Sequence, residues 1–477
     1  MIPIKQHNLF ISNQWIETKN KLKVINPYSH ELLAEVSLAG EQELNAAIDA
    51  AEIAFEKTKQ LTSHERAEAC KSIAQQLQIR REEFAKTIAM ESGKPLIYSR
   101  IEVDRAISTF TIAAEEATRI YGEVMPLDIT SFSGNRIGIT KRFPIGVISC
   151  ISPFNFPLNL VAHKLAPAIA SGNTVVLKPA SGTPLTALLL AEVISNTHLP
   201  KGTVNVVPCD RHSAELLTTD GRIKMVSFTG SPVVGWDIKA KAGKKKVVLE
   251  LGGNAAVIID KDANITKAAQ KCCTGAFAYS GQICVSTQRI YCHENVYDAF
   301  LEELKKCTEK LLAGNPLDEK TTFGPMIDEK NALRIEQWVN EAVGKGAKII
   351  QEGKRDKAFY PATILSNVSK ETAICTEEAF GPIVIVEKVD SFNAALLQVN
   401  DSLFGLQAGI FSNDINNLMK AFNTLVVGGV IANDVPSVRV DNMPYGGVKE
   451  SGFGREGVKY AIQDMTEIKL LVLDDVK

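Results

Sequence analysis

One cysteine of the sequence stands in a setting that could expose its thiol for nucleophilic chemistry. The segment Gly281-Gln-Ile-Cys284 follows a helical run at 268–280 and precedes a strand-like run at 288–291. A loop at a helix end can present a side chain, and Gly281 permits a backbone conformation that other residues avoid. A buried structural cysteine would give the same local pattern. The segment therefore indicates a candidate nucleophile, Cys284, without excluding a role in packing.

A carboxylate interrupts the otherwise apolar segment Leu249-Glu-Leu-Gly-Gly-Asn254. A charged group in an apolar strand is costly to bury unless it has a partner or a task. Burial raises the pKa of a carboxyl, and a raised pKa suits a general base. Glu250 is therefore a candidate base, and a salt-bridged core glutamate is the alternative.

A third segment, Ile151-Ser-Pro-Phe-Asn-Phe-Pro-Leu158, follows a predicted strand. In open α/β sheets, ligands gather at the carboxyl ends of the strands. Asn155 lies between two prolines in a stiff loop, where its amide could donate to a developing oxyanion. An Asx turn is the alternative.

Three further segments lie beside apolar strands: Leu177-Lys-Pro-Ala-Ser181, Ser227-Phe-Thr-Gly-Ser231 and Glu377-Glu-Ala-Phe-Gly-Pro382. Lys178 could meet a ribose or a phosphate, and Ser231 at a helix start could donate to a pyrophosphate. Glu378 followed by Phe380 could hold a ribose and flank a nicotinamide, although a charged turn with a core phenylalanine would look the same. The glycine run at 230–235 is not the common GxGxxG fingerprint, so by itself it is weak evidence for a dinucleotide site.

Periodicity predicts how these segments are positioned. Apolar residues at helical spacing predict helices after Gly40, near 64–81 and near 97–120. From residue 143, short apolar strands alternate with helices up to residue 251, which predicts a parallel sheet covered on both faces. A second alternating series runs from 255 to about 432. The sequence thus predicts an α/β protein with a boundary near 251–255, and a strand-like run at 469–473 that pairs elsewhere or with another subunit.

Composition narrows the function classes. The chain has 477 residues, enough for two or three domains, and 53 basic against 55 acidic residues. No basic excess supports nucleic-acid binding. The nine cysteines are odd in number and include no CxxC, so neither a disulfide scaffold nor a cysteine metal site is expected. The first residues do not resemble a secretory signal, and no apolar stretch is long enough to cross a bilayer. A cytoplasmic protein without nucleic-acid or membrane partners is expected.

In this order and at these distances, the motifs resemble the aldehyde dehydrogenase superfamily. The resemblance runs from Ile25-Asn-Pro-Tyr28 to Pro444-Tyr-Gly-Gly-Val-Lys-Glu-Ser-Gly452. It implies that Cys284 is the nucleophile, with a lowered pKa, and that Glu250 activates water. Asn155 and the backbone N–H of Cys284 would form the oxyanion hole. The reaction implied is oxidation of an aldehyde to the acid through a thiohemiacetal and a thioester on the cysteine.

The resemblance also assigns the cofactor pocket and the fold. Lys178 and Ser181 would meet the adenosine ribose, Ser231 the pyrophosphate, and Glu378 the nicotinamide ribose, with Phe380 near the nicotinamide. The remaining pocket residues implied are Ser152, Pro153, Phe154, Gly230, Val234 and Leu251. The implied fold is a Rossmann-like cofactor domain (1–121 and 143–251), an α/β catalytic domain (252–440) and a small β oligomerisation flap (122–142 and 460–477). Such proteins are commonly homodimers or homotetramers.

The cofactor is expected to be NADP, with NAD also accepted. Many NAD-preferring members carry a glutamate where this chain has Ser181, and that carboxylate would repel a 2′-phosphate. Serine removes the repulsion, and Lys178 lies nearby in sequence. Arg211 or His212 could reinforce a 2′-phosphate site, but a surface loop is the favoured interpretation of this segment.

The substrate is expected to be a small hydroxyaldehyde. Relatives that oxidise phosphorylated or phosphonate aldehydes place three arginines around the substrate; here Arg105 and Arg439 match two of them, and Ile283 occupies the third position. Such a partial clamp weakens the recognition of a phosphate. Structural ion pairing of Arg105 and Arg439 is the alternative. The whole pattern is most similar to archaeal-type lactaldehyde dehydrogenases. Alternatives are succinic semialdehyde or another anionic aldehyde, a CoA-acylating enzyme, and a non-catalytic relative.

Overall fold

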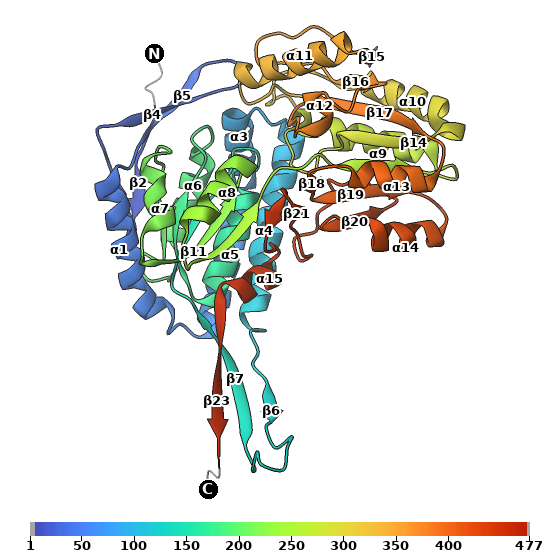
Figure 1. The fold of residues 1–477 in the computed structure, drawn as a ribbon. Coiled ribbons are helices and arrows are strands. Elements are labelled where there is room, and N and C mark those ends of the chain that lie inside the picture. Colours follow the sequence, from blue (N-terminus) through green and yellow to red (C-terminus); the bar gives the residue numbers. More distant parts are fainter. Residues whose placement is uncertain (1–4, 475–477) are drawn as a thin grey trace.

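The structure, a computed structural model, describes residues 5–474 (Figure 1). Its largest sheet has eight strands in the order β22–β12–β11–β8–β9–β10–β2–β3. In that order the strands are Gly452–Phe453, Lys246–Glu250, Ile223–Thr229, Val147–Ile151, Thr174–Lys178, Val204–Val206, Leu9–Ile11 and Gln14–Ile16. The strands from β12 to β10 run parallel, and the outer strands add antiparallel edges.

Helices cover both faces of this sheet. They are α1 (Glu41–Thr58), α2 (Ser63–Ile79), α3 (Arg81–Ser92), α4 (Leu96–Ala117), α5 (Asn159–Ser171), α6 (Leu185–Ser195), a 3-10 turn at Ser213–Glu215, α7 (Leu216–Thr219) and α8 (Pro232–Lys241). Ile148 and Val175 pack in one core with α2, α4 and α5, whereas their neighbours Val147 and Val176 pack on the opposite face with α1. Because successive strand side chains point to opposite faces, the continuous apolar strands predicted this arrangement, which is confirmed.

A second sheet has seven strands in the order β15–β16–β17–β14–β13–β19–β20. In that order they are Lys348–Gln351, Thr363–Ser366, Ile383–Val389, Arg289–His293, Ala256–Ile259, Gln407–Phe411 and Gly429–Ala432. The helices of this region are α9 (Ile265–Phe277), a 3-10 turn at Ala278–Gly281, α10 (Glu294–Thr308), α11 (Glu329–Gly344), α12 (Ala373–Thr376), α13 (Phe392–Asn400) and α14 (Ile415–Thr424). The chain passes from the first sheet to the second between the end of β12 and the start of β13.

Smaller sheets complete the fold. The strands β6 (Val124–Pro126), β7 (Ile137–Pro144) and β23 (Thr466–Leu473) form an arm that extends away from both large sheets (Figure 1). Near the amino end, β1 (Lys5–His7), β5 (Leu32–Ser37) and β4 (Lys21–Ile25) form another sheet, and β18 (Phe404–Gly405) pairs with β21 (Val448–Lys449). The helix α15 (Val458–Asp464) packs against α4 and α5, so the chain returns to the first body before it enters the arm.

The predicted helices and strands lie where periodicity placed them, with boundaries that differ by a few residues. The strands between residues 5 and 37 were not predicted, because each is three to six residues long and lacks a sustained alternation. Within residues 5–474, no helix combines the length and the apolar character that crossing a membrane requires.

Candidate active site

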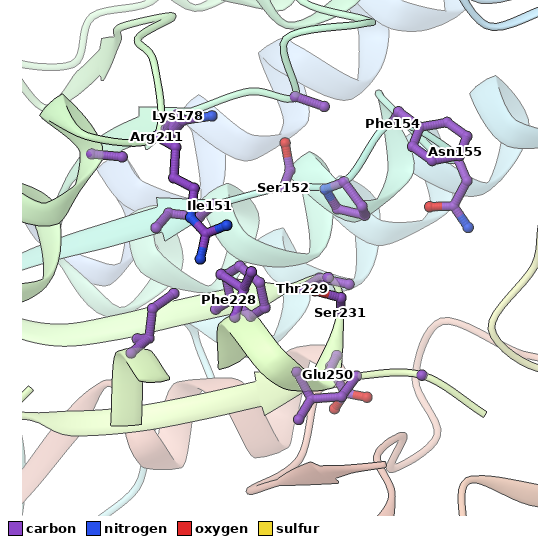
Figure 2. A pocket seen from close by; sticks show the side chains of 18 of the residues that line it. Ile151, Ser152, Phe154, Asn155, Lys178, Arg211, Phe228, Thr229, Ser231 and Glu250 are labelled. Carbon is purple, nitrogen blue, oxygen red and sulfur yellow. The ribbon is translucent and has the colours of Figure 1, made fainter. Parts of the chain in front are cut away.

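The predicted catalytic and cofactor residues meet at one cavity of about 930 Å³, at the carboxyl ends of β8, β9, β11 and β12 (Figure 2). The catalytic candidates that line it are Cys284, Glu250 and Asn155. The cofactor candidates that line it are Ser152, Pro153, Phe154, Lys178, Ser181, Gly230, Ser231, Val234, Leu251, Glu378 and Phe380. Residues from several strand ends thus converge, as expected for a ligand crevice of an open α/β sheet.

A left-handed turn carries Cys284 to the cavity. Tyr279, Ser280 and Gly281 have φ values of +49°, +53° and +69°, immediately after α9. The turn is tied to other segments, because the Ser280 hydroxyl donates to the Gly324 carbonyl at 2.6 Å. A Cβ at position 281 would lie 2.1 Å from the Gly381 oxygen, so this position requires glycine. The sequence had indicated an unusual backbone at Gly281, and it extends over two preceding residues.

The Cys284 thiol has a hydroxyl partner. Its sulfur lies 3.0 Å from the hydroxyl of Tyr445. Burial raises the pKa of the thiol to about 12, and the hydrogen bond with Tyr445 offsets this in part. The expectation of a lowered pKa for Cys284 is therefore wrong for this arrangement, because desolvation outweighs the nearby donor and the Arg439 charge. At neutral pH the thiol keeps its proton until a base takes it.

Glu250 ends β12 as a buried acid. Both of its side-chain oxygens are buried and have no hydrogen-bond partner among residues 5–474. Burial and the neighbouring Glu456 raise the pKa of Glu250 well above its ordinary value. The carboxyl lies beside the segment that carries Tyr445, since a Cβ on Gly446 would come within 2.9 Å of Glu250 Oε1. An unpaired acid of raised pKa that lines the same cavity as the thiol has the properties of a general base.

Two glycines let the chain after Glu250 pass close to the nucleophile. A Cβ on Gly253 would lie 2.2 Å from the carbonyl oxygen of Cys284. A Cβ on Gly252 would lie 2.6 Å from Glu378 Oε2, and the Gly253 N–H donates to Glu378 Oε1 at 3.0 Å. The glycine pair therefore joins the base, the nucleophile loop and the predicted ribose carboxylate through backbone contact.

Asn155 lies on the loop after β8 and faces the nucleophile loop. It is buried, and its Nδ2 donates to the Gln282 carbonyl at 2.9 Å. A primary amide has two N–H groups, so one remains for a ligand. The amide is thus held next to the cysteine loop by a contact that also orients it.

The rest of the cavity has the features of a dinucleotide site. Ser231 precedes α8 and makes no side-chain capping bond, so its hydroxyl and the first N–H groups of the helix are available to an anion. Phe154 and Phe380 meet edge to face with ring centroids 5.7 Å apart, and Phe380 has a φ of +45°.

Two charged groups of the cavity have shifted pKa values. Burial raises the pKa of Glu378 to about 7, while the hydrogen bond from the Gly253 N–H lowers it. Burial lowers the pKa of Lys178, which ends β9, and both Lys178 and Arg211 line the cavity (Figure 2).

A family model described as the aldehyde dehydrogenase family matches residues 15–471. The chain belongs to the aldehyde dehydrogenase family. The chain is 48% identical over 472 residues to 3-sulfolactaldehyde dehydrogenase of Priestia aryabhattai, covering 99% of this chain and 98% of the relative. It is 40% identical over 471 residues to lactaldehyde dehydrogenase of Methanococcus aeolicus, covering 98% and 100%. Aldehyde oxidation is therefore the class of reaction, as the motifs predicted.

Solved structures share the aldehyde dehydrogenase fold. Aldehyde dehydrogenase 21 from Physcomitrella patens, in complex with the reaction product succinate, matches with a TM-score of 0.97 and 46% identity over 100% of this chain and 99% of that one. Glyceraldehyde-3-phosphate dehydrogenase GapN from Methanocaldococcus jannaschii, complexed with NADP, matches with a TM-score of 0.92 and 40% identity over 96% and 100%. The predicted aldehyde dehydrogenase fold, with its α/β architecture, is confirmed.

The predicted substrate residues of this aldehyde dehydrogenase do not line the cavity. Arg105 donates to Asp441 at 2.8 Å and keeps about a fifth of its side chain exposed. Arg439 is buried, pairs with Glu456 at 3.0 Å and lies over the Tyr445 ring at 3.8 Å. Ile283 packs beside Cys284 in an apolar cluster with Val285 and Tyr445. Both arginines thus have structural partners. Arg105 keeps an N–H group without a hydrogen-bond partner among residues 5–474, whereas Arg439 is paired with Glu456 and stacked on Tyr445.

The sequence did not predict the roles of Tyr445, Lys164 and Glu456, which contact or support the site residues. Tyr445 contacts the nucleophile, and Glu456 accepts from both Arg439 and Lys164 at 3.0 Å. The Pro444-Tyr-Gly-Gly segment was recognised as a family feature, but nothing in it shows which side chain the hydroxyl meets. Lys164 could have been flagged as a charge inside the apolar run of α5, whereas Glu456 lies between Arg455 and Gly457 and gives no such signal. Arg211 and His212, for which a surface loop is the interpretation favoured by the sequence, are exposed and also line the cavity.

Proposed function

We propose that this aldehyde dehydrogenase oxidises a small hydroxyaldehyde, or a short aldehyde with one anionic group, to the carboxylic acid with NADP. The observation that carries the proposal is the meeting of the Cys284 thiol, the Asn155 amide and the Glu250 carboxyl at one cavity. A nucleophile, an oxyanion donor and a base within one crevice are the groups that acyl chemistry on a thiol requires.

Cys284 and Asn155 carry out the first step, in which the thiol adds to the aldehyde. The Cys284 thiol gives its proton to solvent as its sulfur attacks the aldehyde carbon, and the free N–H of the Asn155 amide and the Cys284 backbone N–H stabilise the oxyanion. Losing one such donor costs on the order of 10²–10³ in rate. The bond from Asn155 to Gln282 holds the amide in place before the substrate arrives, so little reorganisation is needed.

The second half belongs to Glu250. The nicotinamide cofactor supplies a hydride acceptor when it is bound, and the acyl group stays on Cys284 as a thioester. Glu250 then takes a proton from a water molecule that attacks the thioester. The presence of this base favours hydrolysis over transfer to CoA, since acylating enzymes of this kind usually lack it.

The cavity fits an NADP cofactor. The start of α8 with Ser231 would hold the pyrophosphate, and Glu378 would hold the nicotinamide ribose beside Phe380. At the adenosine end, Lys178, Ser181 and Arg211 line the cavity, so position 181 carries no carboxylate, although Glu215 and Asp237 line the same cavity. A 2′-phosphate is attracted by Lys178 and Arg211, whereas a carboxylate at position 181 would repel it. The NADP complex of the Methanocaldococcus jannaschii structure supports the same cofactor.

The substrate end favours a hydroxyl or a single negative charge. The Arg105 Nε is buried without a hydrogen-bond partner among residues 5–474, and its Nη2 meets Asp441. Arg105 keeps a buried donor without a partner, whereas Arg439 is committed to Glu456 and Tyr445, and neither arginine lines the cavity. The two relatives named for lactaldehyde and 3-sulfolactaldehyde act on short aldehydes with a hydroxyl next to the carbonyl, and succinate corresponds to a short anionic aldehyde.

We also propose a separate role for each of the three regions of the fold. The body around the eight-stranded sheet would bind the cofactor, the body around the seven-stranded sheet would carry Cys284, and the arm of β6, β7 and β23 would join subunits into a dimer or tetramer. Several apolar side chains of β23 are exposed, which is unusual for a surface without a partner.

An aldehyde panel tests the proposal. Purified protein would be assayed with lactaldehyde, 3-sulfolactaldehyde, succinic semialdehyde, glyceraldehyde 3-phosphate, propanal and benzaldehyde, with NADP or NAD, with and without CoA. We expect NADPH and free acid without CoA, with the highest kcat/KM for a hydroxyaldehyde or a singly anionic aldehyde. Turnover that requires CoA would show an acylating enzyme, and no turnover with any aldehyde would show a non-catalytic relative.

A further inference from the structure

A hydroxyl group lies at the nucleophile, and apolar side chains pack around both groups. Tyr445 is 3% exposed, and its hydroxyl lies 3.0 Å from the Cys284 sulfur. Around the two side chains pack Val285, Leu406 and, partly buried, Ile283 and Met443. A buried hydroxyl in such surroundings costs free energy when it has no hydrogen-bond partner. The thiol provides that partner in the resting enzyme.

Tyr445 is held rigidly in this place. Its backbone N–H donates to the Glu456 carbonyl at 3.0 Å, and its carbonyl accepts from the Glu456 N–H at 2.7 Å. Its ring lies under the Arg439 guanidinium at 3.8 Å. The Glu456 carboxylate fixes Arg439 from one oxygen and the buried Lys164 ammonium from the other, each at 3.0 Å. The hydroxyl is therefore positioned before any substrate binds, and the stacked Arg439 guanidinium helps to hold the ring in place.

The reaction removes the partner of this hydroxyl. When the sulfur bonds to the aldehyde carbon, the carbonyl π bond opens, the oxygen takes the electron pair, and the thiol proton leaves to a base. A sulfur bonded to two carbons is a weak acceptor with no proton to donate. The Tyr445 hydroxyl then needs another partner close to the sulfur, and the substrate can supply one.

We infer that Tyr445 selects aldehydes that carry a hydroxyl on the carbon next to the carbonyl, by exchanging its bond to Cys284 for a bond to that hydroxyl. The carbon in question is bonded to the carbon that the sulfur attacks, so its oxygen is separated from the sulfur by three bonds. That separation corresponds to about 3 Å in a bent arrangement, which matches hydrogen-bond reach from a group already beside the sulfur. The inference rests on the proposed function and assigns its preferred substrate class to one residue.

The experiment compares lactaldehyde with propanal, which differ by this hydroxyl alone, on the wild type and on Tyr445→Phe. We expect the wild type to favour lactaldehyde in kcat/KM, and Tyr445→Phe to reduce that ratio by about tenfold or more, because a site built around a hydroxyl bond rejects the analogue that lacks it. Tyr98→Phe is the matched control, since Tyr98 lies on α4 outside the cavity, and it should keep the wild-type ratio.

An equal loss of kcat/KM for both aldehydes in Tyr445→Phe would overturn the inference, because the hydroxyl would then act on the thiol alone. In that case the alkaline limb of the pH profile for propanal oxidation should shift in the variant. If the variant does not fold, the wild type still decides. It should prefer lactaldehyde over both propanal and 3-hydroxypropanal, and equal kcat/KM values for these aldehydes would refute selection by the adjacent hydroxyl. A wild type that oxidises none of them would contradict the proposed function itself, and the inference with it.

Discussion

The backbone of Gly253 lies against the backbone of Cys284, so that a Cβ at position 253 would come within 2.2 Å of the Cys284 oxygen. Gly253 follows Glu250 by three residues on the loop that leaves β12, and Cys284 belongs to the second body. This contact links the strand of the base to the loop of the nucleophile. Their relative position is therefore determined by two backbones rather than by flexible side chains.

Gly253→Ala should therefore impair catalysis without unfolding the protein. The added carbon forces the Cys284 loop or the strand to shift, and a misplacement of about 1 Å can cost about 100-fold in rate. We expect kcat to fall by about that factor. The control is Gly221→Ala, whose added carbon meets nothing within 4 Å and which should keep wild-type kcat. Wild-type kcat in Gly253→Ala would show that the contact is not critical.

Ser181→Glu should move the cofactor preference from NADP toward NAD. A carboxylate near Lys178 repels the 2′-phosphate and can accept a hydrogen bond from the 2′-hydroxyl of NAD. We expect kcat/KM for NADP to fall by about tenfold or more, equivalent to about 1.4 kcal/mol, with a gain for NAD. Arg211→Ala should lower kcat/KM for NADP and leave that for NAD unchanged. A wild type that strongly prefers NAD would contradict the assignment of this end of the cavity.

Acid should destabilise the protein through His163. Burial and then the Arg439 charge lower the pKa of His163 to about 4, although Asp441 accepts its hydrogen bond at 2.9 Å. As the pH falls from about 6.5 to about 4, the unfolded chain binds a proton that the folded chain does not, so the free energy of unfolding decreases across this window. His163→Asn lacks this titration, and its Tm should fall less than that of the wild type between these pH values. Parallel Tm curves would refute the assignment.

Charges on the arm should dissociate the subunits. Ile468 and Val472 on β23 are 58% and 46% exposed in the single chain. If β23 forms the contact between subunits, the double variant Ile468→Glu and Val472→Glu places buried, unpaired charges in the interface. Sedimentation velocity should then show a smaller species than the wild type. Ile53→Glu, at a side chain that is 73% exposed on α1, should sediment like the wild type. An unchanged double variant would locate the contact elsewhere.

The sequence predicted the strand ends of the site better than it predicted the contacts between them. Lys178 and Glu250 each end an apolar strand, as the runs around them indicated. The partner of Cys284, in contrast, lies 161 residues further along the chain, and no local pattern encodes that distance. The left-handed conformation of Tyr279 and Ser280 was likewise invisible, because such residues carry no signal comparable to that of Gly281.

The pKa of Cys284 and the ion pairs around the site could not be predicted from the sequence. A lowered pKa for Cys284 was expected from the chemistry alone, whereas the structure surrounds the thiol with apolar groups that raise it. The ion pairs of the two predicted substrate arginines were likewise not predictable from the sequence. Arg105 and Arg439 match a family pattern, but their ion pairs with Asp441 and Glu456 depend on chain segments that meet after folding.

The most direct test of the account is to trap the acyl group on Cys284. Glu250→Gln keeps the side-chain size but cannot take a proton from water, so the thioester should persist after the hydride has left. The variant would be mixed with NADP and lactaldehyde, the NADPH followed by absorbance, and the digested protein analysed by mass spectrometry. Glu309→Gln, an exposed surface change, should turn over like the wild type.

The account predicts a rapid burst of one NADPH per active site in Glu250→Gln, followed by turnover slowed about 10²–10⁴-fold, with the acyl group on the peptide that contains Cys284. An acyl group on another cysteine, or wild-type steady turnover with no adduct on Cys284, would contradict it.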